Sequence, residues 1–471
     1  MKRLGHNLIS YEMLPIIFTL AWPTMLEQLM QTAVQYVDTA MVGALGTRAT
    51  AAVGATTTLT WLITGVLSAL GIGFLSFIAQ RLGAEDYDAA RQIAAQSVPA
   101  VLVSGLLLTI LILALSPFVP VLMQVDPSIR TLAAVYFFIL YIPTLPRAAT
   151  IIFGTVLRAA GDTKTPMLVG FSVNLINLLL NLLLIYPTRT VTFLSHSFVL
   201  PGAGWGVAGA AAASAVAITI GGVAITVVFW RHPVLSPKDM KLMPDREILR
   251  PCMRIAIPNM LQRFATSMGY VSFASMINAL GEVAAAAHTI ANTVESAFYI
   301  PGYGMQTAAS TLAGNAAGTQ DKQRMRDLTR TILVIEALLM IISGALLFLF
   351  APNMMALFSD HDDVIKLGSA VLRMVAVSEP FFGISIIMEG ILYGVGDTVR
   401  PFVYNVAGMW GVRIAGTFLC TCILGLGLVS AWSCMILHNL FLFGLFIFYC
   451  IRGKDSPLSP SWNTPNHTDK E

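Results

Sequence analysis

The chain has 471 residues, of which 56% are hydrophobic and only 11% are charged. A soluble domain carries roughly 25% charged residues, so this composition excludes an ordinary globular protein. The net charge of +3 is too small to argue for binding to nucleic acid. The mean hydropathy of +0.75 instead indicates a chain that lies largely within a lipid bilayer.

Long stretches of the chain contain no Asp, Glu, Lys or Arg, for example residues 49–80 and 190–230. A membrane-spanning helix needs about 20 apolar residues. Because the runs are continuous and do not alternate, they exclude a β-barrel. The sequence therefore predicts an all-α polytopic membrane protein with twelve transmembrane helices. The predicted helices lie near residues 14–40, 52–78, 94–116, 131–157, 167–186, 204–230, 254–279, 286–315, 328–350, 366–393, 402–423 and 428–451.

The distribution of basic residues predicts the orientation of the chain. The connection between the sixth and seventh helices holds six of them, namely Arg231, Lys238, Lys241, Arg246, Arg250 and Arg254. The positive-inside rule places this connection and both termini in the cytoplasm. Lys2 and Arg3 precede the first apolar segment without an early cleavage site, so this segment is expected to remain as an anchor. We expect a multi-pass protein of the inner (cytoplasmic) membrane.

The sequence repeats itself with a constant offset, the one that carries Pro23 onto Pro258. Both halves have six predicted helices and start on the same side, which is typical of a parallel repeat about an axis along the membrane normal. An insertion near residues 187–199 interrupts the repeat. Further matching segments are Ala44-Leu45-Gly46 with Ala279-Leu280-Gly281, and Gly161-Asp162-Thr163 with Gly396-Asp397-Thr398.

The repeat predicts four parts of the chain. Residues 1–230 form a six-helix amino-terminal lobe, and residues 231–253 form a basic cytoplasmic linker. Residues 254–452 form a six-helix carboxy-terminal lobe, and residues 453–471 form a polar cytoplasmic tail. Two similarly oriented bundles of this kind favour a transporter over a receptor or a membrane enzyme.

Motifs in both halves resemble those of the multidrug and toxic compound extrusion (MATE) family, of the bacterial NorM/DinF-like type. Pro23, Gln28, Gln31 and Val37–Gly43 resemble the signature of its first helix. The turns at 157–163 and 392–398 are similar to its paired LRGxGDT motifs. The resemblance implies a cofactor-free antiporter of two six-helix lobes. Such proteins export organic compounds, mostly cationic and amphipathic, in exchange for H⁺ or Na⁺. The expected partners are therefore small organic substrates and the lipid bilayer, with no nucleic acid, and the expected state is a monomer.

Asp38 is the first candidate for the ion or substrate site. It lies fifteen residues after Pro23, in the outer half of the first helix. A charged side chain within a span is costly and is by default a functional hypothesis, although structural pairing is the usual alternative. Asp38 could exchange a proton, bind Na⁺ or balance a cationic substrate, or it could simply face water at the membrane edge. The family's helix 1 aspartate matches Asp38.

Amide side chains are expected to accompany Asp38. Gln31 lies two helical turns before it on the same face, and Asn174, Asn177 and Asn181 form one polar stripe along the fifth helix. Amides both donate and accept hydrogen bonds, which suits the relay of a protonation change. Hydrogen bonding between helices is the alternative role. Some family members carry an aspartate where Asn181 stands, so this lobe would hold one acid instead of two.

Glu295 and Glu379 are the candidates in the carboxy-terminal lobe. Family members that bind sodium in this lobe use acids on the seventh and tenth helices. The corresponding positions here are Thr266 and a position close to Phe382, so that pattern is not reproduced. Glu379 is one turn from Phe382 and could substitute, and Glu295 could supply the second carboxylate.

Arg263, on the seventh helix, offers a competing structural role for these acids, because it could form an ion pair with Glu295 or with Glu379. Glu389 is expected near the cytoplasmic end, where a solvated role and a binding role are equally open. Pro23 and Pro258 are the predicted conformational residues. Four further charged residues are predicted to be structural partners: Glu27, Glu336, Arg147 and Arg413.

Other functions have weaker support in the sequence. A lipid-linked precursor flippase of the same superfamily is the main alternative, but such proteins often have extra helices and a cationic cleft. An intramembrane enzyme would need a nucleophile–base pair or a metal motif such as HExxH, and neither is found. The sequence therefore predicts neither catalytic residues nor a metal site. A regulatory or scaffold membrane protein would not need acids in the middle of its spans.

Overall fold

The computed structural model describes residues 10–123, 125–193, 196–453, 456 and 459. Nearly all of these residues are helical, as the sequence predicts. Lys2 and Arg3, and most of the predicted tail 453–471, lie outside the described residues.

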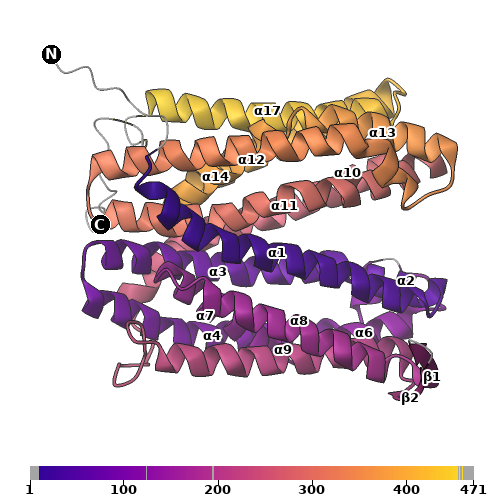
Figure 1. Ribbon diagram of the computed structural model, residues 1–471, viewed down its shortest axis with the longest axis horizontal. Helices are drawn as coiled ribbons and strands as arrows, with labels where there is room; N and C mark the ends of the chain where they lie inside the picture. Colours follow the sequence, from indigo (N-terminus) through magenta and orange to yellow (C-terminus); the bar gives the residue numbers. More distant parts are fainter. Residues whose placement is uncertain (1–9, 124, 194–195, 454–455, 457–458, 460–471) are drawn as a thin grey trace. The chain divides into compact units, whose positions relative to one another are not determined.

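The first half of the chain supplies the predicted helices from 14–40 to 204–230 (Figure 1). A two-stranded hairpin, which the sequence did not predict, occupies the insertion between the fifth and sixth ranges. The elements are α1 (Met13–Gly43), α2 (Thr47–Gly54), α3 (Thr57–Gly83), α4 (Tyr87–Leu115), α5 (Val119–Leu122), α6 (Arg130–Tyr141), α7 (Thr144–Ala159), α8 (Lys164–Leu184), β1 (Pro187–Phe193), β2 (His196–Ala203) and α9 (Gly206–Arg231).

The second half supplies the remaining six predicted ranges. The eleventh range of the chain, 402–423, changes from α-helical to π-helical winding. The elements are α10 (Arg246–Asn278), α11 (Glu282–Gly318), α12 (Lys322–Ala356), α13 (Asp362–Ala376), α14 (Glu379–Gly394), α15 (Val399–Val406), η1 (Ala407–Ile414), α16 (Ala415–Thr417), η2 (Phe418–Ile423) and α17 (Leu428–Arg452).

Length and hydropathy make many of these helices able to cross a membrane. Within the described parts of the chain, eight helical segments are long and apolar enough, and two bent helix pairs raise the number to ten. The two remaining predicted ranges, 254–279 and 286–315, are occupied by the long helices α10 and α11. These two helices carry more polar residues than the others, which lowers their hydropathy.

Two predicted helices are broken, and both breaks fall at equivalent positions of the repeat. The range 131–157 is bent by 51° between α6 and α7, and the range 366–393 is bent by 55° between α13 and α14. Pro143 stands at the first break and has no N–H to continue the helix. Ser378 stands at the equivalent position of the second half, and its hydroxyl donates to the carbonyl oxygen of Val375 at 2.9 Å. Each of these predicted ranges is therefore occupied by two helices with a bend between them, and the sequence did not predict the bend.

Backbone geometry confirms the repeat independently of residue type. Three pairs of positive φ angles, which L-residues rarely adopt, occur at equivalent positions of the two halves. The pairs are Gly46 (105°) with Gly281 (108°), Glu85 (58°) with Gln320 (55°), and Gly161 (83°) with Gly396 (88°). The two halves therefore share their turns as well as their helices.

The Gly-Asp-Thr turns cap the helices that follow them, and the aspartate is the capping residue. Asp162 accepts a hydrogen bond from the N–H of Thr165 at 3.0 Å, and Asp397 accepts one from the N–H of Arg400 at 3.2 Å. The hydroxyl of Thr398 instead donates to the carbonyl oxygen of Ile255 at 2.7 Å. The aspartate bonds satisfy N–H groups that the first helical turn leaves free.

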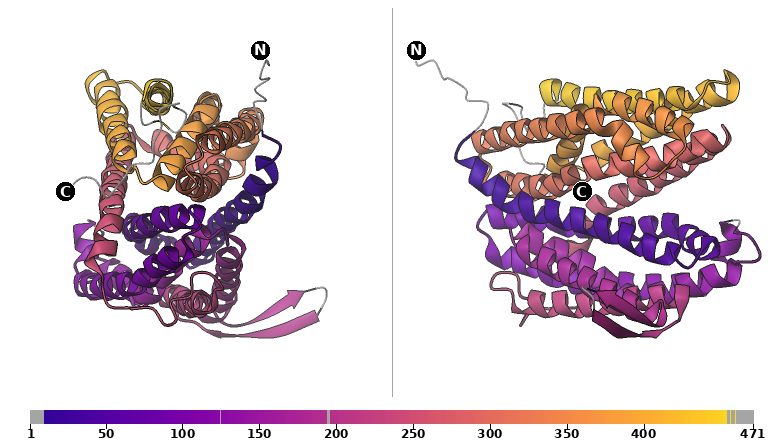
Figure 2. Two further views of the ribbon diagram at one scale, coloured as in Figure 1. Left: turned by 90° about the vertical axis from the view of Figure 1, so that its left-hand side faces the viewer. Right: turned by 45° about the vertical axis from the view of Figure 1, so that its right-hand side comes forward.

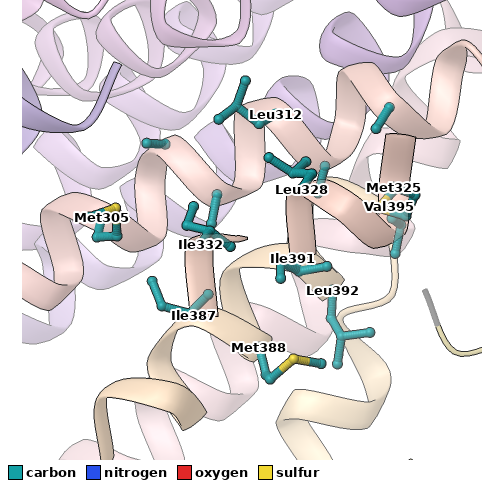
Figure 3. Close-up of a cluster of buried hydrophobic side chains, with 14 of the residues drawn as sticks. Met305, Leu312, Met325, Leu328, Ile332, Ile387, Met388, Ile391, Leu392 and Val395 are labelled. Atoms are coloured by element: carbon teal, nitrogen blue, oxygen red, sulfur yellow. The ribbon is translucent and has the colours of Figure 1, made fainter. Parts of the chain in front are cut away.

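The chain packs as two compact units, whose boundaries differ from those of the sequence halves. Unit 1 comprises Met1–Gln28, Leu75–Ala90 and Arg250–Glu471. Its helices α11, α12 and α14 pack side by side (Figure 1). They enclose an apolar core of Leu, Ile, Met and Ala side chains, among them Leu328, Ile332 and Ile391 (Figure 3).

Close helix packing in unit 1 depends on two equivalent glycines. A Cβ atom at Gly83 of α3 would clash with the carbonyl oxygen of Asn315 on α11. A Cβ atom at Gly318 of α11 would clash in turn with the carbonyl oxygen of Gln80 on α3. The offset of the repeat relates the two contacts, so this helix crossing has the symmetry of the repeat. Small residues of this kind let helix backbones approach closely.

Unit 2 comprises Leu29–Phe74 and Arg91–Leu249. Its helix α9 packs against α6, α7 and α8. The connection after α9 is ordered against α4, where Arg91 donates to the carbonyl oxygens of Ser236 and Lys238 at 2.7 and 2.5 Å. Burial lowers the pKa of His232, whose Nδ1 accepts hydrogen bonds from the N–H groups of Val234 and Leu235 at 3.2 and 3.0 Å. The connection is therefore a structured segment of unit 2.

The insertion near residues 187–199 forms the antiparallel pair β1–β2 and projects away from the helices that it joins (Figure 2). A β-bulge between Pro187 and Arg189 begins the pairing. The β-branched residues Thr190 and Val191 favour a strand here, but the segment is too short to stand out in so apolar a sequence.

Candidate functional site

Asp38 on α1 is the centre of a polar cluster in unit 2. Its carboxylate Oδ1 accepts a hydrogen bond of 2.7 Å from Nδ2 of Asn181 on α8. Asn181 is 1% exposed, and Asp38 is partly exposed. The structure therefore brings together the acid and one of the amides that the sequence singled out. When Asp38 is charged, this bond joins an ionised group to a buried amide, which is a comparatively strong arrangement.

Asn177 extends the cluster from the same face of α8, one turn before Asn181. Its Oδ1 accepts from Asn181 Nδ2 at 3.1 Å, and its Nδ2 donates to the hydroxyl of Ser214 on α9 at 2.8 Å. With the Asn177 amide turned over, its nitrogen lies 2.9 and 3.1 Å from the two oxygens of Asp38, and its oxygen accepts from Ser214. The Ser214 hydroxyl can accept or donate, so it fits both orientations.

The buried Oδ1 of Asn181 has no hydrogen-bond partner among the described residues. A carboxylate can only accept hydrogen bonds, whereas a carboxylic acid can also donate one. A protonated Asp38 could therefore donate to this free oxygen after a turn of the amide. The cluster thus contains both a donor for charged Asp38 and an acceptor for neutral Asp38.

The other predicted residues of this lobe lie at the margin of the cluster. Gln31 is exposed, two turns before Asp38 on α1, and Asn174 is partly exposed, one turn before Asn177 on α8. Sequence reasoning missed Ser214, and it missed Tyr136 on α6, which interacts electrostatically with Asp38. Ser214 comes from α9, which packs beside α8, and Tyr136 comes from α6, which packs beside α9. No spacing in the sequence indicates these contacts.

A second group of acids lies in unit 1, on three adjacent helices. Glu295 of α11, Glu336 of α12 and Glu379 of α14 are all buried. Glu379 interacts electrostatically with both of the others. The structure therefore places the predicted pair, Glu295 and Glu379, in one region. It adds Glu336, for which the sequence prediction of a structural partner was wrong, because neither of its oxygens has a hydrogen-bond partner in the described chain.

Arg263 does not form the ion pair that the sequence suggested. Its Nε donates instead to Oδ1 of Asn259, one turn earlier on α10, at 3.3 Å. Across the described residues, the ion pairs within 4.0 Å include neither Arg263–Glu295 nor Arg263–Glu379. The cation that interacts with Glu295 is Arg413 of η1. Arg413 is buried, and its guanidinium lies over the rings of Phe273 and Tyr270 at 4.1 and 5.0 Å.

Glu389 of α14 is partly buried and well supplied with hydrogen-bond donors. Its carboxylate accepts from Gln262 of α10, from Gln306 of α11 at 3.1 Å and from Asn405 of α15 at 3.3 Å. Tyr393, one turn later, also donates to it. Neutral donors from four helices thus stabilise one carboxylate, which favours a role in holding these helices together over a solvated surface role.

The two predicted conformational prolines lie inside continuous helices, Pro23 in α1 and Pro258 in α10. Beside Pro23, the Thr24 hydroxyl donates to the carbonyl oxygens of Ala21 at 2.8 Å and of Gly304 on α11 at 2.7 Å. The second of these bonds ties the α1 segment to α11 within unit 1. Among the described side chains, no group of three His, Cys, Asp or Glu residues is arranged to hold a metal ion.

Helical spans in a parallel repeat, with acids buried inside them, define a polytopic membrane transporter. The MatE family profile matches residues 23–183 and 258–419, one match in each half of the repeat. The chain belongs to the MatE family. The two matched segments begin at Pro23 and Pro258, so the family match and the internal repeat coincide.

Relatives match over almost the whole chain. A probable multidrug resistance protein NorM of Thermotoga maritima is 27% identical over 442 residues, which cover 93% of this chain and 92% of that protein. The multidrug resistance protein PmpM of Pseudomonas aeruginosa is 24% identical over 84% of this chain and 82% of its own. The structure of a MOP superfamily transporter from Pyrococcus furiosus, 24% identical, superposes with a TM-score of 0.84 over 93% of this chain and 96% of its own.

Proposed function

We propose that the chain is a secondary active transporter that exports organic compounds, mostly cationic and amphipathic, in antiport with H⁺ or Na⁺ by alternating access. The names of its relatives support drug export as the cellular role. We place the protein in the inner membrane as a monomer with both termini in the cytoplasm. The acids and amides inside the spans suit cations, whereas a flippase for diphosphate-linked lipids would need basic groups there.

The hydrogen-bonded cluster around Asp38 is the observation that carries the proposal. Charged Asp38 accepts from Asn181, and in the second amide orientation it accepts from Asn177 as well. When Asp38 binds a proton, or when a cation occupies its oxygens, these amides must reorganise. The change is transmitted through Asn177 to Ser214 on α9. Cation binding at one carboxylate is thereby coupled to the hydrogen bonds that join three helices.

The remaining predicted residues have supporting roles in this proposal. Gln31 and Asn174 line the margin of the Asp38 cluster and contact substrate or ion. Glu295 and Glu379 provide negative charge in the second half. Pro23 and Pro258 weaken their helices, because a proline removes one backbone hydrogen bond, and so allow the helices to bend during the transport cycle.

Transport in proteoliposomes with an imposed proton or sodium gradient tests the proposal. We expect one of the two gradients to drive a fluorescent organic cation across the membrane in the direction opposite to the downhill flow of the ion. The variant Asp38→Asn should lose this movement, because an amide cannot exchange a proton and is a weaker cation ligand. Thr39→Ser is the matched control, since Thr39 is exposed beside Asp38 and its hydroxyl donates to the carbonyl oxygen of Gln35 in the same helix. Transport at the normal rate by Asp38→Asn would remove this residue from the mechanism.

A further inference from the structure

Glu336 is a buried acid that no neighbouring side chain satisfies. It is 0% exposed, and neither carboxylate oxygen has a hydrogen-bond partner among the described residues. Its Oε1 lies in space left by two glycines, since a Cβ at Gly302 of α11 or at Gly383 of α14 would come within 2.7 or 3.0 Å of it. The carboxyl group of α12 therefore points between α11 and α14.

Glu379 is the second such acid, and it interacts electrostatically with Glu336. It is 1% exposed, and both of its oxygens also lack partners in the part of the chain that the structure describes. Gly383, against which Glu336 lies, follows Glu379 by one turn on the same face of α14. On the α12 side, Glu379 Cβ lies 3.6 Å from where a Cβ of Gly344 would be.

The groups around this pair supply little positive charge. From α11, Glu295, Tyr299 and Tyr303 interact electrostatically with Glu379. The buried cation Arg413 acts on Glu295. From α13, the exposed Arg373 donates to the carbonyl oxygen of Phe348. Leaving two bare carboxylates uncompensated inside a span is very costly.

We propose that Glu336 and Glu379 together form a binding site for one small monovalent cation, a proton or an alkali metal ion. The inference deepens the proposed function, because it assigns cation binding in the second half to a pair on α12 and α14. A shared proton would join the two carboxyl groups, and an alkali ion would take their oxygens as ligands. Glu379 lies one turn from Phe382 on the predicted tenth helix, whereas Glu336 of α12 is outside the pair of acids that the sequence singled out in this half.

The site sits at the edge of the apolar core of unit 1. Ile332, one turn before Glu336 on α12, and Ile387, one turn after Gly383 on α14, both belong to that core (Figure 3). Packing of this kind keeps water from solvating the carboxylates. A bound cation is then the means by which their charge is balanced, and its loss should loosen the contact of α12 with α14.

Cation-dependent stability of the purified full-length chain tests the inference. Thermal unfolding in detergent is followed during a Na⁺ titration at fixed pH and, in a second series, during a pH titration without Na⁺. Binding to the folded state raises the melting temperature with ligand concentration. Infrared difference spectra of the protonated carboxyl band, taken across the pH series, identify proton binding. We expect the melting temperature to respond in one of the two series. Glu336→Gln and Glu379→Gln should each abolish this response, and the double variant should behave like either single variant.

Matched variants separate this response from general damage. Glu282→Gln changes an exposed acid on α11 and should keep the response. Gly383→Ala should reduce it while both acids remain, because the added methyl group displaces the Glu336 carboxyl group. Both series are repeated with Asp38→Asn. The response should persist in this variant whether or not Asp38 is needed for antiport, so the two proposals are tested separately. A full response in the Glu336→Gln/Glu379→Gln double variant, or no response of the normal chain in either series, overturns the proposal.

Discussion

Asn181 occupies a position at which one amide can serve both states of a neighbouring acid. Its nitrogen donates to Asp38, and its buried oxygen is without a partner among the described residues. A buried amide oxygen that stays unpaired costs roughly 1–3 kcal/mol. Such a cost is tolerated where the group is needed in another state of the protein, and a protonated Asp38 would be a donor for it.

Removing the Asn181 side chain should therefore impair cation coupling more than removal of a neighbouring amide. A hydrogen bond to a charged group contributes about 1.5–3 kcal/mol, so we expect Asn181→Ala to lower gradient-driven transport about tenfold or more. The dependence of the Asn181→Ala transport rate on pH or on Na⁺ concentration should shift as well. Asn174→Ala, two turns away on α8, should have a smaller effect. Initial rates in proteoliposomes check this, and equal effects of the two variants would argue against the relay.

Sequence spacing predicted part of this site, because Asn177 and Asn181 share a helical face. It could not predict Ser214, which is a small residue in an alanine-rich helix and acquires its role only by packing beside α8. Glu336 shows the same limit of sequence prediction, but here the sequence predicted an interaction that the structure lacks among the described residues. A charged residue in a span suggests a structural partner, and only the packing of Gly302 and Gly383 reveals that its carboxyl group has none in the described chain.

At the scale of the helices, the apolar ranges of the sequence located the helices but not the breaks within them. The breaks between α6 and α7 and between α13 and α14 have different chemistry, a proline in one case and a serine that bonds its own backbone in the other. Apolar composition continues across both breaks, so a hydropathy window cannot detect them. The repeat could have done so, since Pro143 and Ser378 occupy equivalent positions of the two halves.

The glycine crossing of α3 and α11 gives a prediction about helix packing. A methyl group at Gly83 or at Gly318 meets a backbone carbonyl oxygen, which cannot move aside as a flexible side chain can. Overpacking of this kind typically costs about 1–3 kcal/mol. We expect Gly83→Ala and Gly318→Ala to lower the melting temperature by similar amounts, because the two contacts are equivalent.

The control for these variants is Gly444→Ala on α17, where nothing in the described chain lies within 4 Å of the added Cβ. Alanine is the better helix former by roughly 1 kcal/mol, so this variant should be as stable as the normal chain or more stable. Unfolding is followed in detergent at one protein concentration. A melting temperature of Gly318→Ala equal to that of Gly444→Ala would show that the crossing tolerates a wider separation.

At the scale of the whole chain, the repeat connects sequence, backbone and topology. Six spans in each half return the chain to its starting side, so the two halves have the same orientation. The hairpin β1–β2 precedes α9, and the basic connection follows it. One span separates these two segments, so they must face opposite sides of the membrane. The positive-inside rule assigns the connection to the cytoplasm.

Cysteine labelling tests this arrangement directly. Thr190 on β1 and Lys241 in the basic connection are both exposed, and Cys422 is the exposed native thiol to be replaced first. In a Cys422→Ser chain, a membrane-impermeant maleimide should label Thr190→Cys in intact cells. Lys241→Cys should be labelled in everted vesicles and protected in intact cells.

The result bears on transport as well as on topology, because export requires that the acids of the two halves be reached from defined sides. Labelling of both cysteines in intact cells would mean that α9 does not cross the membrane. The first half would then have an odd number of spans, and the two halves would lie in opposite orientations. The shared positive-φ turns at Gly161 and Gly396 would then lie on opposite sides of the membrane. Labelling of Thr190→Cys alone would place both turns on the cytoplasmic side, where their aspartate caps begin α8 and α15 alike.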